Sequence, residues 1–189
     1  MKIKAFTILA FWACVGGSYA GVGGGVGPYA TALKGVGDYV FGAGVRGELT
    51  FNKYIGLEAR VSYTDAADAD AGIMPFEAGI VGIIPLGKSN AELFGCVGGG
   101  YYTITGDTTV GSTGLEMDPI FGFYGAAGLN VFVTKNIKLF IDIKYTSAKN
   151  EATETTTGGI AGFYTWTRTT SVEYGVDGVG GDIGVMFTF

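Results

Sequence analysis

A chain of 189 residues has the length of one domain, and 35 glycines with only four prolines argue against a disordered or collagen-like chain. Its 17 acidic and 12 basic residues give a formal net charge of −5, which argues against nucleic acid as a partner because no basic patch is available to neutralise phosphates. Hydrophobic residues make up 48% of the sequence, but no run of about 18 apolar residues follows residue 20, so no membrane-spanning helix is predicted.

The N-terminal segment MKIKAFTILAFWACVGGSYA has the three regions of a secretory signal peptide. Lys2 and Lys4 form its basic region, and an apolar stretch continues to about Val15. Ser18 and Ala20 then place small residues three positions and one position before a cleavage site. We therefore expect cleavage after Ala20.

Cleavage divides the chain into a signal peptide, residues 1–20, and a single domain, residues 21–189. The alternative, an uncleaved membrane helix, would have to continue through a glycine run into Pro28, where a helix is disfavoured. Without Lys2 and Lys4 the domain has ten basic and 17 acidic residues, a formal charge of −7. Cys96 is then the one cysteine, so no internal disulfide is expected.

Beyond residue 20 the chain alternates between apolar and polar positions, which is the period of a β-strand with one apolar face. In one such segment Leu57 and Val61 share one parity, whereas Glu58 and Arg60 share the other. The same pattern predicts eight strands, near residues 21–29, 39–51, 55–63, 76–86, 93–101, 121–133, 137–145 and 181–189.

The connections between these strands alternate in length. Tight turns are predicted at 52–54, 87–90 and 134–136, and longer polar segments near 30–38, 65–72, 104–118 and 147–172. All long segments therefore fall at one end of the sheet, which we call the loop end. The turns and both chain termini fall at the other, the turn end.

The distribution of side chains predicts a closed barrel that is turned inside out relative to a soluble protein. One face of each strand is apolar, whereas the other is rich in glycine and carries few charges. About ten residues per strand, tilted by roughly 40°, span roughly 25 Å, the height of the apolar band of an outer-membrane barrel. Closure also removes unpaired strand edges, as a bilayer requires. The alternative is a soluble, lipocalin-like barrel with an apolar interior.

Aromatic residues gather at both ends of the predicted strands, as expected for rings that sit at two membrane interfaces. Loop ends carry Tyr39, Tyr63, Phe76, Tyr101, Phe121 and Tyr145, and turn ends carry Phe51, Tyr54, Phe187 and Phe189. The sequence therefore predicts an all-β fold, a closed antiparallel eight-stranded up-and-down transmembrane β-barrel that follows a cleaved signal peptide.

Ten charged residues occupy the polar parity of the strands and are predicted to form a polar network in the lumen: Arg46, Glu48, Glu58, Arg60, Glu77, Glu92, Lys138, Asp142, Lys144 and Asp182. An eight-stranded barrel is only wide enough inside for side chains, so these charges should pair across it as a structural plug. A tight turn brings the first four together, and diagonal pairing would relieve repulsion between like charges that face each other. A gated ion or proton path is the alternative.

The segment 149–171 stands out among the predicted loops. Threonine alternates with aromatic residues from Ile160 to Thr170, which suggests strands that rise beyond the membrane as an extended surface hairpin. Its exposed edges, with Tyr164 and Trp166, are candidates for β-augmentation by a host or neighbouring protein. The alternative is a mobile loop without a ligand.

The domain at residues 21–189 resembles the small eight-stranded outer-membrane barrels of Gram-negative bacteria, the OmpA/OmpX type. The most specific local match is the ending GDIGVMFTF, with Ile183, Val185 and Phe187 in alternation and a final Phe189. The resemblance implies that these four residues form a signal that the barrel assembly machinery recognises. We expect no peptidoglycan-binding domain after Phe189, in contrast to two-domain OmpA proteins.

The sequence contains no histidine, which argues against an enzyme. The barrel enzymes of the outer membrane, such as the omptin proteases and the phospholipases, rely on histidine as a base or proton carrier. GAGVRG, residues 42–47, matches a dinucleotide-binding glycine pattern, but the sequence that follows has the period of a strand instead of a helix. No catalytic, cofactor-binding or metal-binding residue is predicted, and Cys96 is expected to be an inert inward residue.

These expectations together describe a monomeric, multi-pass protein of the cell outer membrane. We expect it to contribute to envelope integrity and to surface interaction, in adhesion or host-factor binding, through long extracellular loops. The expected partners are outer-membrane lipid and lipopolysaccharide, the barrel assembly machinery, and host or neighbouring surface proteins. The alternative function is a narrow, porin-like channel for small or hydrophobic solutes, similar to OmpW.

Overall fold

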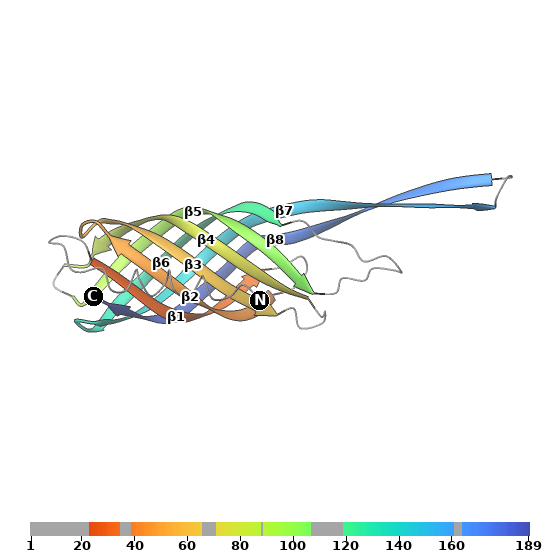
Figure 1. The fold of residues 1–189 in the computed structure, drawn as a ribbon. Coiled ribbons are helices and arrows are strands. Elements are labelled where there is room, and N and C mark those ends of the chain that lie inside the picture. Colours follow the sequence, from red (N-terminus) through yellow and green to blue (C-terminus); the bar gives the residue numbers. More distant parts are fainter. Residues whose placement is uncertain (1–22, 35–38, 66–70, 88, 107–118, 161–163) are drawn as a thin grey trace.

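The fold is a closed barrel of eight antiparallel strands, each hydrogen-bonded to its neighbours in sequence (Figure 1). The computed structural model describes residues 23–34, 39–65, 71–87, 89–106, 119–160 and 164–189, and the side chains of all of these except residues 71, 104–106, 151–160 and 164–174. The strands are β1 (Gly23–Lys34), β2 (Tyr39–Thr50), β3 (Ile55–Asp65), β4 (Ala71–Pro85), β5 (Ala91–Gly106), β6 (Ile120–Thr134), β7 (Ile137–Ile160) and β8 (Tyr164–Thr188). The predicted fold class is confirmed.

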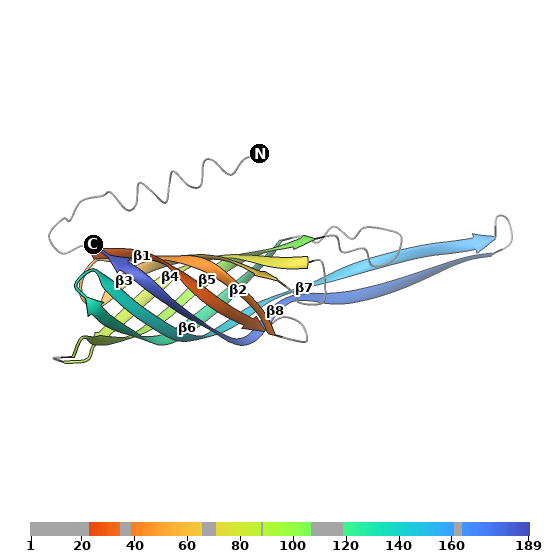
Figure 2. The same cartoon turned by 90° about the horizontal axis from the view of Figure 1, so that it is seen from below.

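The barrel closes where the C-terminal strand pairs with the first strand. Val26 is in register with Phe187, and Ala30 with Ile183. Gly24 and Phe189 also exchange two backbone hydrogen bonds, of 3.2 and 3.0 Å, at the turn end. The alternating, aromatic ending of the chain therefore has a partner along its length, and the β1–β8 seam leaves no unpaired edge between them in the barrel wall (Figure 2).

The N-terminal segment is outside this description. Residues 1–22, which contain the expected signal peptide and its cleavage site after Ala20, lie outside the described residues. The division of the chain at that site therefore stays a prediction. Within the described part of the chain, no helix is long and apolar enough to cross a membrane.

Several strands extend further toward the loop end than the sequence pattern predicts. β1 continues to Lys34, β4 already begins at Ala71, and β5 continues to Gly106. In β1 the alternation persists because Thr31 and Leu33 are buried in the lumen, whereas the outward positions are alanines. Alanine has too little apolar surface to mark a lipid-facing position in the sequence, so the strand pattern was underestimated there.

β7 and β8 form a hairpin that projects far beyond the other strands (Figure 1). They contain 24 and 25 residues, against 11 to 16 in the other strands. Their pairing continues without a break in register from Ile137↔Phe187 to Ile160↔Tyr164. Gly175 and Gly178 of β8 have φ of +139° and +135°, which favour glycine because L side chains rarely adopt this conformation. The predicted extended hairpin is therefore present.

The two walls of the barrel have opposite chemistry. Large apolar side chains cover the outer wall, among them Phe41, Phe121 and Phe123, all of which are well exposed. The inner wall holds buried charged and polar side chains together with two buried apolar clusters. This inversion excludes the soluble, lipocalin-like alternative, because a soluble barrel buries its apolar face and exposes its polar one.

Candidate functional site

The ten charged residues predicted for the lumen all lie on the inner wall of the barrel. They are contributed by six strands: β2 (Arg46, Glu48), β3 (Glu58, Arg60), β4 (Glu77), β5 (Glu92), β7 (Lys138, Asp142, Lys144) and β8 (Asp182). Nine are buried, and Glu92 is half-buried near the turn end. Each is inward because it occupies the parity opposite to the lipid-facing side chains of its strand.

The register of β2 and β3 places like charges directly opposite each other. Arg46 faces Arg60, and Glu48 faces Glu58. The repulsion is relieved along diagonals, as Arg46 Nη2 lies 2.8 Å from Glu58 Oε2 and 3.3 Å from Glu48 Oε2. Arg60 Nε in turn lies 2.8 Å from Glu58 Oε1. Each guanidinium therefore contacts carboxylates on both sides of it instead of the opposite guanidinium.

Arg60 also reaches across the lumen to β7 and β8. Its Nη1 donates to Asp142 Oδ2 at 3.0 Å and to Asp182 Oδ2 at 2.6 Å. Lys144 Nζ lies 2.9 Å from Glu77 Oε2 and 3.7 Å from Asp182 Oδ2. A single connected network thus joins strands on opposite sides of the barrel. Such fully buried pairs hold a core in one arrangement only when both partners are present.

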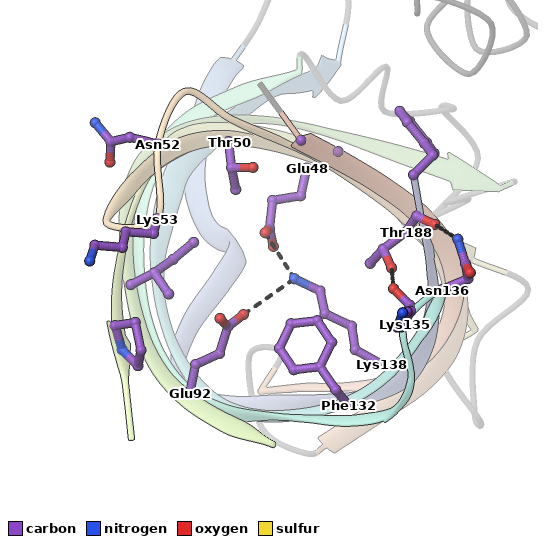
Figure 3. A pocket seen from close by; sticks show the side chains of 15 residues that line it. Glu48, Thr50, Asn52, Lys53, Glu92, Phe132, Lys135, Asn136, Lys138 and Thr188 are labelled. Atoms are coloured by element: carbon purple, nitrogen blue, oxygen red, sulfur yellow. Dashed lines mark hydrogen bonds and ion pairs between the residues drawn. The ribbon is translucent and has the colours of Figure 1, made fainter. Parts of the chain in front are cut away.

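The turn end of the network opens into a pocket of about 390 Å³ (Figure 3). Lys138 Nζ is held there between Glu48 Oε1, at 2.9 Å, and Glu92 Oε1, at 3.6 Å. Asn130 donates to the same oxygen of Glu92 at 2.8 Å. In Figure 3 the two carboxylates converge on Lys138 while Lys53 points away from it. This end of the network therefore borders an open cavity.

Aromatic residues fill the space between the charges. The sequence analysis did not include these aromatic residues in the predicted network. The guanidinium of Arg46 lies between the rings of Phe94 and Phe140, 4.5 and 4.7 Å from their centres. The hydroxyls of Tyr124 and Tyr102 donate to Glu58, at 3.1 Å, and to Glu77, at 3.0 Å. A signal for these residues existed, since an aromatic residue on the polar parity of a strand must point into the lumen.

An apolar layer covers the network on its loop side. Its buried members are Leu33, Tyr102, Ile120, Ala148 and Val176, with Val40 and Ile73 packed against them. Side chains therefore occupy the lumen from the charged network to this layer, as expected for a barrel of eight strands. The arrangement is that of a plug.

The lumen offers little for catalysis or metal binding. Among the described residues, no group of three or more histidine, cysteine or acidic side chains is placed to hold a metal ion. Cys96 is buried, and its sulfur lies 3.5 Å from the hydroxyl of Tyr124. The neighbouring carboxylate of Glu58 disfavours a thiolate at this position. Cys96 is therefore a small core residue, since nucleophilic cysteines need an exposed, electropositive setting.

The remaining candidate residues lie on β8 or directly after it. Ile183 and Phe187 are exposed on the outer wall, and Phe189 is exposed at the turn end. Val185 is partly buried on the same face. Tyr164 and Trp166 belong to the distal part of the hairpin, where the backbone is described but the side chains are not. The structure does not bring these two groups together, because they sit at opposite ends of the strand.

Solved structures with this architecture include bacterial outer-membrane and surface proteins. The outer membrane protein OprG from Pseudomonas aeruginosa is 18% identical over 92% of this chain and 98% of its own, with a TM-score of 0.64. Neisserial surface protein A is 12% identical over 88% and 94%, with a TM-score of 0.56. Ail, the attachment invasion locus protein of Yersinia pestis, is 15% identical over 90% and 100%, with a TM-score of 0.50.

Sequence comparison adds no closer relative. No family model matches the chain, and no curated protein matches it significantly. At 12–18% identity the likeness is one of fold, and it extends over nearly the whole length of each of these proteins. The resemblance drawn from the alternating strands is thereby confirmed, and the chain has the fold of the small eight-stranded outer-membrane β-barrels.

Proposed function

We propose that this protein is a non-enzymatic barrel of the outer membrane that contributes to envelope integrity and presents its loop end for surface interaction. The apolar outer wall and the aromatic residues at both ends support a place in the lipid bilayer. The missing histidines and the plugged lumen support a role outside catalysis. Lipid and lipopolysaccharide would be its immediate partners.

The length of the β7–β8 hairpin is the observation that carries this proposal. Beyond Ser147↔Phe123 the described part of β7 pairs with β8 alone, and beyond Ala32↔Gly181 the described part of β8 pairs with β7 alone. A two-stranded ribbon in water is marginally stable by itself and has two strand edges available for pairing. Such an edge suits β-augmentation by an extended segment of another protein.

The register of the hairpin assigns different residue types to its two faces. One set of cross-strand pairs is composed of threonine and serine: Thr153↔Ser171, Thr155↔Thr169 and Thr157↔Thr167. The alternate pairs are Ala152↔Val172, Glu154↔Thr170, Thr156↔Arg168, Gly158↔Trp166 and Ile160↔Tyr164. Because cross-strand partners share a face, both aromatic positions belong to one face, together with apolar, charged and threonine positions. We propose the aromatic face, with Tyr164 and Trp166, as the side that meets a partner.

A truncated hairpin tests the proposal. Replacing residues 151–173 by Asn-Gly would join Asn150 and Tyr174, which are in register, through a two-residue turn. We expect the variant to refold with heat-modifiable migration on gels but to lose adhesion to cells and binding of serum proteins. A second variant keeps the full length and exchanges Tyr164 and Trp166 for threonine, and we expect it to lose binding as well, because it removes the proposed contact face. Unchanged binding by the truncated barrel would contradict the proposal.

A narrow channel for small or hydrophobic solutes is the alternative, and the lumen geometry does not favour it. A solute would have to displace Arg46 and Lys144, whose side chains are fully buried in ion pairs. We expect no conductance steps from the purified barrel in planar bilayers, and none from Arg60→Ala. Steps in the wild type, or solute uptake into liposomes, would favour the channel instead.

The C-terminal residues are proposed as the signal for the assembly machinery. Phe189 also bonds through its backbone to Gly24, so its deletion would remove two hydrogen bonds in addition to the ring. Phe189→Ala keeps the backbone and is the cleaner test. We expect it to slow insertion in cells more than it lowers the stability of barrel already inserted, as measured by urea unfolding. Normal insertion of this variant would refute the signal.

A further inference from the structure

The buried charges of the lumen do not balance. Among the side chains that the structure describes, the buried cations are Arg46, Arg60, Lys138 and Lys144, and the buried carboxylates are Glu48, Glu58, Glu77, Asp142 and Asp182. Glu92 stands apart because its side chain is 14% exposed beside the open pocket. Five buried carboxylates therefore share four buried cations. An uncompensated charge in such a place is strongly disfavoured.

The imbalance is concentrated at Asp142 and Asp182. The two aspartates are direct cross-strand partners on β7 and β8, so their side chains lie side by side on the inner wall. Both offer the same oxygen, Oδ2, to one atom, Nη1 of Arg60, at 3.0 and 2.6 Å. Their second cations, Arg46 Nη1 for Asp142 and Lys144 Nζ for Asp182, each lie 3.7 Å away. Two like charges that face each other and share one guanidinium nitrogen at hydrogen-bond distance form the least compensated part of the network.

The second oxygen of each carboxylate has no hydrogen-bond partner. Oδ1 of Asp142 and Oδ1 of Asp182 are both buried and unpaired among the described residues. The hydroxyl of Thr31, which is in register with Asp182 across the β1–β8 seam, is likewise unpaired. A buried carboxylate oxygen without a donor is rare in folded proteins. A proton on one Oδ1 turns that carboxyl into a donor and supplies the missing hydrogen bond.

We propose that Asp142 and Asp182 form a proton-binding pair that together hold one proton on their Oδ1 side at neutral pH. The proton comes from the solvent when the barrel folds and lies between the two Oδ1 atoms or between one of them and Thr31. With it, four positive charges face four negative charges in the sealed lumen. A metal ion fits less well there, because the guanidinium of Arg60 already lies against both carboxylates.

The groups around the pair come from every neighbouring strand. The titratable and charged side chains that face it or its partners are Tyr29 of β1, Arg46 of β2, Glu58 and Arg60 of β3, Glu77 of β4, Cys96 of β5, Tyr124 of β6 and Lys144 of β7. Histidine is absent from the sequence, so ordinarily no other side chain changes charge between about pH 6 and 8. A side-chain proton that the folded barrel loses in that range therefore reports on this pair.

The stability of the refolded barrel as a function of pH tests the proposal. A folded state that binds one more proton than the unfolded chain loses stability as the pH rises, and its folding equilibrium constant falls by up to about tenfold per pH unit. We expect this slope in urea unfolding of the wild type in detergent micelles between about pH 6 and 8. Asp142→Asn and Asp182→Asn should each abolish it, because either change removes the surplus charge.

Glu92→Gln is the matched control, since it removes a carboxylate of the same network at the open mouth and should keep the slope. A flat wild-type profile, or a slope that persists in both asparagine variants, would overturn the proposal. If neither asparagine variant refolds, infrared spectroscopy of the wild type and of Glu92→Gln decides. A protonated carboxyl band at neutral pH in both folded proteins supports the pair, and its absence refutes it.

Discussion

The inner and outer walls of the barrel are formed by alternate residues of the same strands, yet their glycines have opposite surroundings. At Gly98, which faces the lumen, an added Cβ would overlap the carbonyl oxygen of Ala78 and lie 2.7 Å from the ring of Tyr124. At the next residue, Gly99, which faces outward, the nearest heavy atom is the carbonyl oxygen of Gly122 at 3.7 Å. At this pair of positions glycine is required inside and merely tolerated outside.

The contrast teaches that the two walls obey different physical constraints. The lumen is a close-packed protein interior in which every side chain has fixed neighbours, so changes in volume or charge there have nowhere to relax. The outer wall faces lipid, a solvent that adapts to its shape, and needs only apolar character. Substitutions of one kind should therefore have large effects on the inner wall and small effects on the outer wall.

The largest effect is expected at Arg60, where a neutral side chain of similar length would leave three carboxylates without their shared cation. Arg60→Met should lower the free energy of unfolding by about 3–5 kcal/mol, as for other broken buried ion pairs. Urea unfolding in detergent micelles, followed by circular dichroism, measures it. Lys53→Met at the exposed turn end is the control and should change little. If Arg60→Met lowers the free energy of unfolding by less than about 1 kcal/mol, Arg60 contributes no more to stability than an exposed salt bridge does.

The adjacent glycines offer the most direct comparison of the walls. Gly98→Ala should lower the free energy of unfolding by about 1–3 kcal/mol, because the added methyl group collides with backbone atoms of β4 that cannot move aside. Gly99→Ala should be neutral or stabilising by up to about 1 kcal/mol, because it restricts the unfolded chain without a clash. The same unfolding experiment compares them. Equal effects at the two positions would show that the walls do not differ in packing.

Phenylalanine permits a third comparison, with a smaller expected effect. Phe140 is buried with its ring against the guanidinium of Arg46, whereas Phe123 is exposed on the outer wall. Phe140→Leu should lower the free energy of unfolding by about 1–2 kcal/mol through the lost ring contact with the cation and the space left behind. Phe123→Leu should leave it nearly unchanged in micelles. A larger loss at Phe123 would indicate that the outer wall also has a fixed neighbour.

The smallest effect is expected at the loop-end rim, where Asp177 accepts hydrogen bonds from Lys149, at 3.0 Å, and from Tyr145, at 3.1 Å. The hydrogen bond from Lys149 lowers the pKa of Asp177. Its contribution to stability is therefore present above the ordinary pKa of aspartate and disappears as the pH falls through the lowered pKa. Asp177→Asn should shift the thermal midpoint slightly at neutral pH and not at all in acid. A change in thermal midpoint that is larger in acid than at neutral pH would contradict this prediction.

Much of the fold could be predicted because strand alternation is a local property. Glu58 and Arg60 fall on the parity opposite to Leu57, and that observation alone assigns them to the lumen. The ends of strands were harder to predict. β1 continued through alanines that carry little pattern, and the hairpin length depended on threonines that suit a loop as well as a strand.

The candidate site was likewise predictable only in part. The tight turn between β2 and β3 made a cluster of Arg46 and Glu58 predictable, since the two are close in sequence. The contacts of Arg60 with Asp142 and Asp182 were not predictable, because these aspartates lie 82 and 122 residues from Arg60 in the chain. Neither was the stacking of Phe94 and Phe140 on Arg46, which depends on how far each strand is shifted along the barrel.

The sequence by itself determined which residues face the lipid and which face the lumen, where the chain turns, and that its aromatic ending needs a partner strand, because each of these depends on neighbours along the chain. Tertiary structure decided which charged side chains meet and that the surplus negative charge lies at the Asp142–Asp182 pair. It also decided how far β7 and β8 extend beyond the other strands. These features depend on register and closure, which exist only when all eight strands are paired.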